Sequence, residues 1–560
     1  MVETLTNTPC CLDFAASKCV VNVDLCYLVG GGTGGLAVAR RLAEDGRHTV
    51  LVLESGGIPK EGNEIPALAP GFTSDSDIIF RYTSVPQQNA ALSTDGLERI
   101  ISGRMLGGTS SLNYMHFNRG SPRDYDAWAE STGDQSWKYS NMLPYLKRIE
   151  TYAGDYPSDQ HGYFGPVMLS RPKYAPGLDY WLEAGKSLGY QTRVDPNGPQ
   201  KISKRTELNY CPLKELIVNL DTRFTATEFS KRLGRRDSSY TAYIQPILSS
   251  TPNLRVLTNV NATQIMFSGK HAVGVKFDSN IQNSYSTDNV VYAKKEIIIS
   301  AGSYGSPVLL MRSGIGPREV LEAAKIPILQ ELPVGKNLQN HIALELDFLI
   351  NDTSAVIHPP RDFTPENLEL FNRTGDGPYS SAGGATGQAF IASSVAKAAG
   401  ESDWADIQFT MAHSVKEVLR VMETESYQRL GARFDSIEIP ACMNFQMKSD
   451  EFLACYIKHL SHNGCHPVGT CKMGPSRPFC CVIGIHGLRI ADASVMPSIV
   501  NANTQVAVYA IAERVSELIL QQWQQQSSFR QKSWHHGQSQ FGGQSWQRFS
   551  FGRKHFPSYF

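Results

Sequence analysis

The sequence lacks an excess of charge of either sign, and it lacks a long apolar run. Its 53 basic and 53 acidic residues cancel, so nothing indicates a nucleic acid or an anionic membrane surface as a partner. No apolar run approaches the roughly 18 residues that a membrane span needs. The N-terminus has neither the basic start nor the apolar core of a signal peptide. We therefore expect a soluble protein with no membrane span, and the compartment stays open.

The sequence also lacks paired metal ligands. It contains eleven cysteines, an odd number, so at least one is unpaired within a monomer. A zinc site usually needs ligands at short spacing such as C-x-x-C, and no such pair occurs. We expect no metal site, and the cysteine spacing leaves disulfide pairing and oligomeric state open.

A chain of 560 residues is long enough for two or more domains. Apolar strand patterns alternate with helical ones in separated segments, which predicts an α/β fold, α+β overall, with a second sheet-rich domain inserted into a nucleotide-binding domain. Past residue 521 no helical or strand period remains, which indicates a disordered tail. The predicted boundaries are 20–60, 98–160, 240–330 and 480–522 for the nucleotide-binding domain, 61–97, 161–239 and 331–479 for the substrate or cap regions, and 523–560 for the tail.

Residues 24–54 form the clearest motif. An apolar run meets Gly30, Gly32 and Gly35 in the spacing G-x-G-x-x-G, an amphipathic helix follows, and a second apolar run ends on Glu54. This is the strand–turn–helix–strand–acid order of a dinucleotide-binding unit. The glycines permit the tight turn and a close backbone approach to a pyrophosphate, and the helix N-terminus favours its negative charge. An acid rather than an arginine at the end of the second strand disfavours a cofactor with a 2′-phosphate, which leaves NAD and FAD as alternatives.

Three further glycine-rich or polar stretches carry chemistry. Residues 103–113 (GRMLGGTSSLN) let backbone N–H groups approach an anionic or flat ligand. Residues 302–316 follow the apolar strand at residues 295–301. Residues 466–474 (HPVGTCKMG) precede the loops at 492–494 and 501–503.

Together these stretches resemble the glucose–methanol–choline (GMC) oxidoreductases, a family of FAD-dependent enzymes. The family's two long glycine-serine patterns match at residues 103–126 and 302–316, and VGKNLQNH at residues 334–341 matches with Asn340 where the family usually has Asp. The resemblance covers residues 24–520 and is closest in texture to the arthropod glucose-dehydrogenase-like branch, then to aryl-alcohol oxidases. It implies a doubly wound, Rossmann-like FAD domain with an inserted substrate domain built on an antiparallel sheet flanked by helices.

The resemblance also implies how FAD is held. Glycines would hold the pyrophosphate, Glu54 would bind the ribose, and Asp492 would lie near the ribityl chain. Leu112 stands where some members carry a flavin-linking histidine, so we expect non-covalent FAD. The cofactor-binding residues implied are Gly30, Gly32, Gly35, Glu54, Arg104, Gly108, Thr109, Asn113, Ala262, Asp492 and Ala493.

The resemblance places His466 as catalytic base and Asn503 as its partner. Histidine suits proton removal because its unperturbed pKa lies near neutrality, and asparagine can orient the alkoxide by hydrogen bonding. Asn503 could instead be a helix cap, and Cys465 and Cys471 fit packing roles. The remaining histidines singled out, His341, His459 and His462, fit structural roles.

These residues predict an alcohol oxidase or dehydrogenase that removes a proton and passes hydride to flavin. The substrate would be a small alcohol, aromatic or a cyanohydrin by branch resemblance, and oxygen or another acceptor would reoxidise the flavin. The alternative is a hydroxynitrile lyase, in which FAD does not turn over. The family resemblance also makes an extracellular location plausible.

Overall fold

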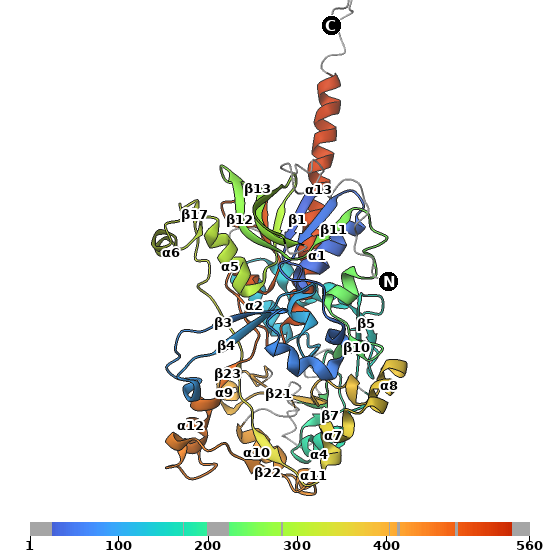
Figure 1. The fold of residues 1–560 in the computed structure, drawn as a ribbon, viewed down its shortest axis with the longest axis vertical. Coiled ribbons are helices and arrows are strands. Elements are labelled where there is room, and N and C mark those ends of the chain that lie inside the picture. Colours follow the sequence, from blue (N-terminus) through green and yellow to red (C-terminus); the bar gives the residue numbers. More distant parts are fainter. Residues whose placement is uncertain are drawn as a thin grey trace, which may run out of the picture. The chain divides into compact units, whose positions relative to one another are not determined.

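The two apolar runs around the first glycine-rich turn form neighbouring parallel strands in the computed structural model (Figure 1). The structure describes residues 25–171, 173–198, 223–281, 284–402, 404–410, 415–475 and 480–539. β1 (Leu25–Val29) pairs with β2 (Thr49–Leu53), and α1 (Thr33–Glu44) connects them. Short buried strands with a helical crossover are typical of a parallel sheet. The predicted strand–helix–strand unit is confirmed.

Three strands from distant segments complete this sheet. β11 (Leu254–Leu257) pairs with β2, β15 (Ile297–Ile299) pairs with β1, and β24 (Leu488–Ile490) pairs with β15, all in parallel. The strand order is β11-β2-β1-β15-β24. All three isoleucines of β15 are buried, as expected for a central parallel strand. The predicted α/β fold is confirmed.

The strand order places a topological switch point between β1 and β15. From β1 the chain moves to β2 on one side, whereas β15 and β24 lie on the other. Ligands of open α/β sheets bind outside the carboxyl ends of the strands at such a point. The glycine-rich turn after β1, α5 (Gly302–Arg312) after β15 and the loop after β24 all begin at this edge.

A three-stranded antiparallel sheet follows β11. β12 (Val260–Ser268), β13 (His271–Ile281) and β14 (Ser284–Tyr292) are joined in that order. Gly269 takes a φ of 57° in the turn between β12 and β13, a conformation that glycine adopts without a steric penalty. The predicted Ser-Gly-Lys hairpin is confirmed.

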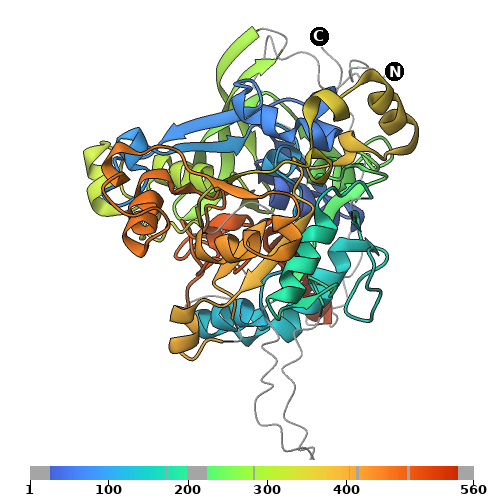
Figure 2. The same ribbon diagram turned by 90° about the horizontal axis from the view of Figure 1, so that it is seen from below.

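A second region is built on two four-stranded sheets. One has the order β21-β20-β8-β7, with β7 (Gln191–Thr192), β8 (Arg223–Ala226), β20 (Gly387–Ile391) and β21 (Ile407–Thr410). The other has the order β10-β9-β6-β5, with β5 (Glu150–Ala153), β6 (Val167–Ser170), β9 (Phe229–Arg232) and β10 (Arg235–Arg236). Figure 2 shows from below how segments from late in the chain, coloured orange, lie beside the cyan and green segments that contain β5 to β10. Trp181, Phe224 and Phe409 belong to one hydrophobic core, which is formed by the first of these sheets and the helices around it.

The remaining strands of the described residues form two-stranded sheets, and further helices lie between the strands along the chain. The helices are α2 (Pro122–Thr132), α3 (Tyr139–Ile149), α4 (Leu178–Ser187), α6 (Arg318–Ala323), α7 (Pro359–Asp362), α8 (Pro365–Thr374), α9 (Ser394–Ala398), α10 (Val415–Met422), α11 (Glu425–Gln428) and α12 (Asp450–Leu460). The strands are β3 (Ile79–Thr83), β4 (Arg99–Gly103), β16 (Ile315–Gly316), β17 (Gln330–Glu331), β18 (Ile342–Ala343), β19 (Asp347–Leu349), β22 (Arg433–Asp435) and β23 (His462–Asn463).

The last helix is longer than the sequence predicted. We expected it to end near residue 520, whereas α13 runs Gln505–Ser539, so residues 523–539 of the expected tail are helical. Residues 540–560 lie outside the described part of the chain. By its contacts the chain divides at Ser516 into two units, and the second contains this extension. Among the described residues no helix combines the length and apolarity required to cross a bilayer.

A buried ion pair joins two strands of the parallel sheet. Arg489 in β24 donates from Nε and Nη2 to the two carboxylate oxygens of Glu296, just before β15, at 2.5 and 3.1 Å. Both side chains are nearly inaccessible to solvent. We expect Arg489→Met to lower the free energy of unfolding by about 3–5 kcal/mol, because it leaves a buried carboxylate without its cation. Denaturant unfolding followed by circular dichroism measures this.

The matched control is Arg318→Met. Arg318 pairs with Glu331 at 2.9 Å, but both side chains are more than half exposed, so water replaces the lost partner. This variant should keep the unfolding midpoint of the unaltered protein. Equal destabilisation by the two substitutions would show that burial does not decide the strength of the Arg489 pair.

Candidate active site

A cavity of about 1250 Å³ lies at the carboxyl edge of the parallel sheet. Pockets for one small ligand usually measure roughly 300–1000 Å³, so this cavity has room for a dinucleotide and a second small molecule. Among the described residues, Gly35 and Arg104 lie outside its lining. The predicted site residues that line it are Gly30, Gly32, Glu54, Gly108, Thr109, Ala262, Asn113, His466, Asp492, Ala493 and Asn503.

The first glycine turn is packed too tightly for side chains. A Cβ on Gly30, which has a φ of +107°, would lie 2.3 Å from the carbonyl oxygen of Ser300. A Cβ on Gly35 would lie 2.0 Å from the carbonyl oxygen of Gly30, and one on Gly108 would lie 2.8 Å from Cα of Gly32. Gly35 therefore lets α1 pack against the turn, while Gly30, Gly32 and Gly108 keep a bare backbone beside the cavity. This cradle fits a pyrophosphate.

Glu54 lies at the end of β2 with its carboxylate fixed by backbone donors. The Gly31 N–H donates to Oε2 and the Gly56 N–H donates to Oε1, both at 2.8 Å. Burial raises the pKa of this carboxyl, and these hydrogen bonds oppose the shift. Because a carboxylate oxygen accepts two hydrogen bonds, Oε2 can still accept one from a ribose hydroxyl. The residue fits the predicted ribose site.

Arg104 and Asn113 differ in their surroundings. The Arg104 guanidinium lies over the ring of Phe80, 5.7 Å from its centroid, rather than in the cavity lining. Asn113 lines the cavity and is held by Arg236, whose Nη1 donates to its backbone oxygen at 2.6 Å and to Oδ1 at 3.1 Å. Arg236 is buried, and burial lowers its pKa to about 9. Arg236 was not predicted from the sequence, because a lone arginine after a polar loop carries no local signal.

The carboxylate of Asp492 is already saturated by protein donors. Oδ2 accepts from the Gly302 N–H at 2.9 Å and from Oγ of Ser306 at 2.5 Å. Oδ1 accepts from the N–H and Oγ of Ser494 at 2.8 and 2.5 Å. Four hydrogen bonds use the lone pairs of a carboxylate, so Asp492 joins α5 to the loop after β24. Its backbone, with Ala493, is the part that a ligand can reach.

His466 and Asn503 meet in the cavity although they come from different loops. His466 follows β23, and Asn503 lies two residues before α13. Nδ2 of Asn503 lies 3.2 Å from Nε2 of His466. The structure thus brings together the two residues predicted to be catalytic.

The other side of His466 is held by the segment at residues 334–341. Nδ1 of His341 lies 3.0 Å from Nδ1 of His466, and the His466 N–H donates to Oδ1 of Asn340 at 2.8 Å. We had assigned His341 a structural role, but its ring contacts the candidate base directly. Asn340 accepts this bond without the negative charge that an aspartate would bring.

Two amides fix the orientation of Asn503. Nδ2 of Asn118 and Nε2 of Gln408 both donate to Oδ1 of Asn503, at 2.8 and 3.0 Å. Asn118 is itself held by Gln388, because the two side chains exchange hydrogen bonds of 3.1 Å in both directions. With Oδ1 occupied, Nδ2 of Asn503 points to His466. None of these three amides was predicted from the sequence: Asn118 lies inside the matched stretch 103–126 without a role assigned to it, and Gln388 and Gln408 belong to no motif.

Burial dominates the electrostatics of the candidate base. Burial, with smaller contributions from His341 and His116, lowers the pKa of His466 to about 3. Burial also lowers the pKa of His341, against a hydrogen bond to the Val500 backbone. His466 is therefore neutral near pH 7 and can accept a proton.

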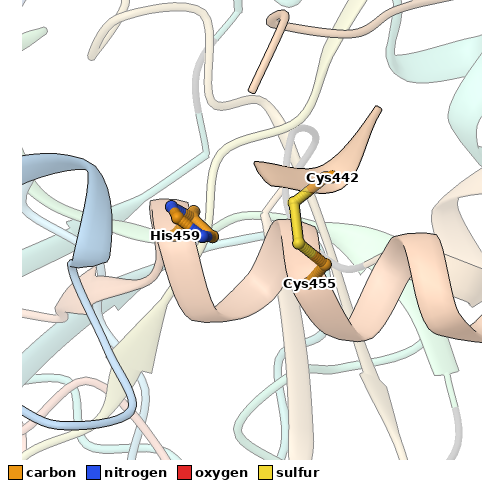
Figure 3. Close-up of side chains that lie close together, drawn as sticks. All are labelled: Cys442, Cys455 and His459. Atoms are coloured by element: carbon orange, nitrogen blue, oxygen red, sulfur yellow. A yellow bond between two sulfur atoms is a disulfide. The ribbon is translucent and has the colours of Figure 1, made fainter. Parts of the chain in front are cut away.

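Among the described residues, one group has the composition of a metal site. The ligand atoms of Cys442, Cys455 and His459 lie within 4.8 Å of one another. Figure 3 shows, however, that Cys442 and Cys455 form a disulfide. Its sulfurs are not thiolates, which are the form of cysteine that binds metal ions. The group supports no metal site.

Comparisons with known proteins identify relatives along most of the chain. The sequence profiles of the N- and C-terminal parts of the GMC oxidoreductases match residues 82–343 and 398–512. Glucose dehydrogenase [FAD, quinone] of Drosophila melanogaster is 28% identical, over 89% of this chain and 86% of that protein. Ecdysone oxidase of Spodoptera littoralis is 29% identical, over 91% and 96%. The predicted family and its arthropod likeness are confirmed.

Solved structures share the fold. An FAD-dependent oxidoreductase from Chaetomium thermophilum has a TM-score of 0.73 at 22% identity, covering 90% of this chain and 100% of that chain. A fungal aryl-alcohol oxidase has a TM-score of 0.70 at 21% identity, covering 90% and 99%. The chain belongs to the GMC oxidoreductase family, whose members bind FAD and oxidise alcohols.

Proposed function

We propose that His466 removes the hydroxyl proton of an alcohol while Asn503 holds the alcohol oxygen. The observation that carries this proposal is the meeting of His466 Nε2 and Asn503 Nδ2, 3.2 Å apart, in the cavity that the glycine cradle lines. A neutral imidazole can accept the proton, and an amide N–H can donate to the oxygen that loses it. FAD bound in the cavity would accept the hydride that leaves the alcohol carbon.

The amides favour the tautomer that a base at this position needs. Nδ2 of Asn503 can only donate, so Nε2 of His466 is the acceptor and the single proton of its neutral ring lies on Nδ1. That proton points at Nδ1 of His341, 3.0 Å away. His341 then accepts through Nδ1 and donates through Nε2, in agreement with its hydrogen bond to the Val500 backbone. Nε2 is therefore the unprotonated nitrogen of the ring, and His466 and Asn503 both line the cavity.

We infer that FAD is held without a covalent bond. Leu112 lines the cavity at the predicted linking position, and an alkyl side chain has no atom that can attack a flavin. Gly30, Gly32 and Gly108 would hold the pyrophosphate, and Glu54 the ribose. The other residues we assign to FAD are Thr109, Asn113, Ala262, Ala493 and, through its backbone, Asp492; Gly35 and Arg104 would act from outside the lining.

The lining favours a small alcohol with an apolar or aromatic body. Tyr82 and Tyr304 line the cavity with their ring centroids 5.2 Å apart, and Phe80 lies beside them in the lining. The two rings are tilted by 41°, and aromatic rings pair favourably at such distances, which supports a benzylic alcohol as substrate. Cyanohydrin cleavage gains no support, because the residue facing Nε2 of His466 is Asn503 rather than a second histidine.

We also infer the division into two domains and an extracellular compartment. The parallel sheet draws its strands from residues 25–53, 254–299 and 488–490, which supports a discontinuous FAD domain with the substrate domain inserted. The disulfide Cys442–Cys455 supports an oxidising compartment.

We expect His466→Ala to lower the rate constant of flavin reduction by about 10²–10⁴-fold, the usual contribution of a general base. The cavity that holds FAD is otherwise kept, so the purified variant should retain its yellow colour. Anaerobic mixing with a panel of benzylic and aliphatic alcohols, followed by flavin absorbance, measures the rate. Peroxide formation in air then tests oxygen as the acceptor.

The matched control for this experiment is His459→Ala. His459 lies beside the disulfide and does not line the cavity among the described residues, so its loss should leave the rate constant unchanged. Undiminished flavin reduction in His466→Ala would refute the assignment of the base. Release of the carbonyl compound and cyanide from a cyanohydrin without bleaching would favour the lyase.

The rate of flavin reduction should depend little on pH. A base works when unprotonated, so activity falls as pH drops through its pKa in the protein. Because the pKa of His466 is about 3, flavin reduction should vary less than twofold between pH 8 and pH 5. An ordinary histidine, with a pKa of about 6.5, would lose most of its activity over this range. Stopped-flow reduction at several pH values distinguishes the two.

Asn340→Asp supplies the matched variant. It keeps an acceptor for the His466 N–H and adds a negative charge, which stabilises the protonated imidazole and raises its pKa. The pH at which activity falls should move upward in this variant. A fall between pH 6 and 7 in the unaltered protein would contradict the predicted effect of burial.

A further inference from the structure

His116 is a second histidine in the lining of the cavity beside His466, and the proposed reaction does not use it. Its side chain is 8% exposed, and it lines the same cavity as His466 and Asn503. Nδ1 is buried without a hydrogen-bond partner, and no side chain or backbone group of the described residues bonds to Nε2. More than nine-tenths of buried polar groups in native proteins have a partner.

The packing around His116 does not require a nitrogen. Its ring meets the ring of Phe229 edge-on, with centroids 5.2 Å apart, and its backbone bridges to Phe229 of β9. A phenylalanine or leucine would make the same contacts without burying an unpaired nitrogen, which costs about 1–3 kcal/mol. Nδ1 is closed off from solvent, so Nε2 is the nitrogen to which a ligand in the cavity could supply the missing partner.

The chemistry of that ligand group follows from burial. Burial lowers the pKa of His116 to about 4, so near neutral pH its ring is uncharged, with one N–H donor and one acceptor. An uncharged ring does not attract a carboxylate or phosphate by charge. It pairs well with a hydroxyl or a carbonyl group.

The hydroxyl or carbonyl group that His116 would bind differs from the alcohol that reacts. The reacting hydroxyl belongs beside Nε2 of His466 and Nδ2 of Asn503, which lie 3.2 Å apart, within hydrogen-bond reach of both. His116 is near enough to His466 to contribute to the lowered pKa of that base, yet among the described residues no hydrogen bond joins His116 to His466 or Asn503. It would thus reach a second oxygen of the same small molecule.

We propose that His116 forms a second polar subsite, which hydrogen-bonds a hydroxyl or carbonyl oxygen of the substrate other than the alcohol that reacts. The substrate class is then alcohols with two oxygen functions, such as diols, hydroxyketones and hydroxylated benzylic alcohols. This inference rests on the proposed alcohol oxidation.

The test uses pairs of alcohols that differ by one oxygen. Suitable pairs are benzyl alcohol with each hydroxybenzyl alcohol, and pentan-1-ol with pentane-1,5-diol. The measured quantity is the rate constant of anaerobic flavin reduction in the FAD-loaded full chain, divided by the dissociation constant of the alcohol. It should be about 10- to 100-fold higher for at least one member with the second oxygen, the range for one hydrogen bond to a buried group. In His116→Phe, which keeps the ring contact with Phe229, this ratio should fall towards one.

A second variant and a binding measurement separate the subsite from a structural role. His116→Gln keeps a donor and an acceptor and should restore part of the ratio, even if His116→Phe folds poorly. The methyl ethers of the reacting hydroxyls cannot be oxidised, and their dissociation constants, followed by shifts of the oxidised flavin absorbance, should show the same preference. His459→Phe, outside the cavity lining, should retain the ratio of the unaltered protein.

The outcomes distinguish the two proposals. If alcohols bleach the flavin but all pairs give the same ratio in the unaltered protein and in His116→Phe, the subsite is refuted and the alcohol oxidation stands. If no alcohol bleaches a yellow protein, the proposed function fails, while the ether binding constants still decide whether His116 recognises the second oxygen.

Discussion

Close contact between backbone segments, with no side chain between them, is the constraint on which this site depends. A Cβ on Gly30 would collide with Ser300 after β15, one on Gly34 would lie 2.4 Å from the carbonyl oxygen of Ala491 after β24, and one on Gly108 would press on Gly32. The ends of three parallel strands and the second glycine loop therefore meet within van der Waals contact. Only this convergence leaves free N–H groups and a cavity at the same edge, so the cofactor position follows from missing side chains.

The orientation of one amide governs the chemistry at the other end of the cavity. Asn503 could present either its oxygen or its nitrogen to His466. Donors from Asn118 and Gln408 occupy the oxygen, and the exchange of hydrogen bonds with Gln388 holds Asn118 in turn. The nitrogen is left for His466, which must then accept through Nε2. A chain of uncharged amides thus selects the tautomer, without a carboxylate behind the ring.

Local sequence patterns were sufficient to predict the parts of the site whose residues belong to a motif. The glycine spacing and the acid that ends β2 predicted the cradle and Glu54, and motif resemblance predicted His466 and Asn503. Pattern could not predict Arg236 or Asn118, because they reach Asn113 and Asn503 across 123 and 385 residues. It also could not show that Asp492 is saturated, since this depends on Gly302 and Ser306, 190 and 186 residues away. The extra length of α13 could not be predicted, because a segment rich in Gln and Ser shows no apolar periodicity.

Among the described residues no carboxylate hydrogen-bonds to the candidate base, which has a consequence for where charge can form. Among the described residues, His466 hydrogen-bonds only to Asn340, His341 and Asn503, and its low pKa reflects burial without a compensating acid. A buried cation without a partner is costly, so a protonated His466 is stable only while a negative charge lies on the ligand side of the cavity. Proton uptake by the ring is then coupled to charge formation in the bound molecules. An aspartate at position 340 would weaken that coupling, because it would stabilise the protonated ring before any substrate reacts.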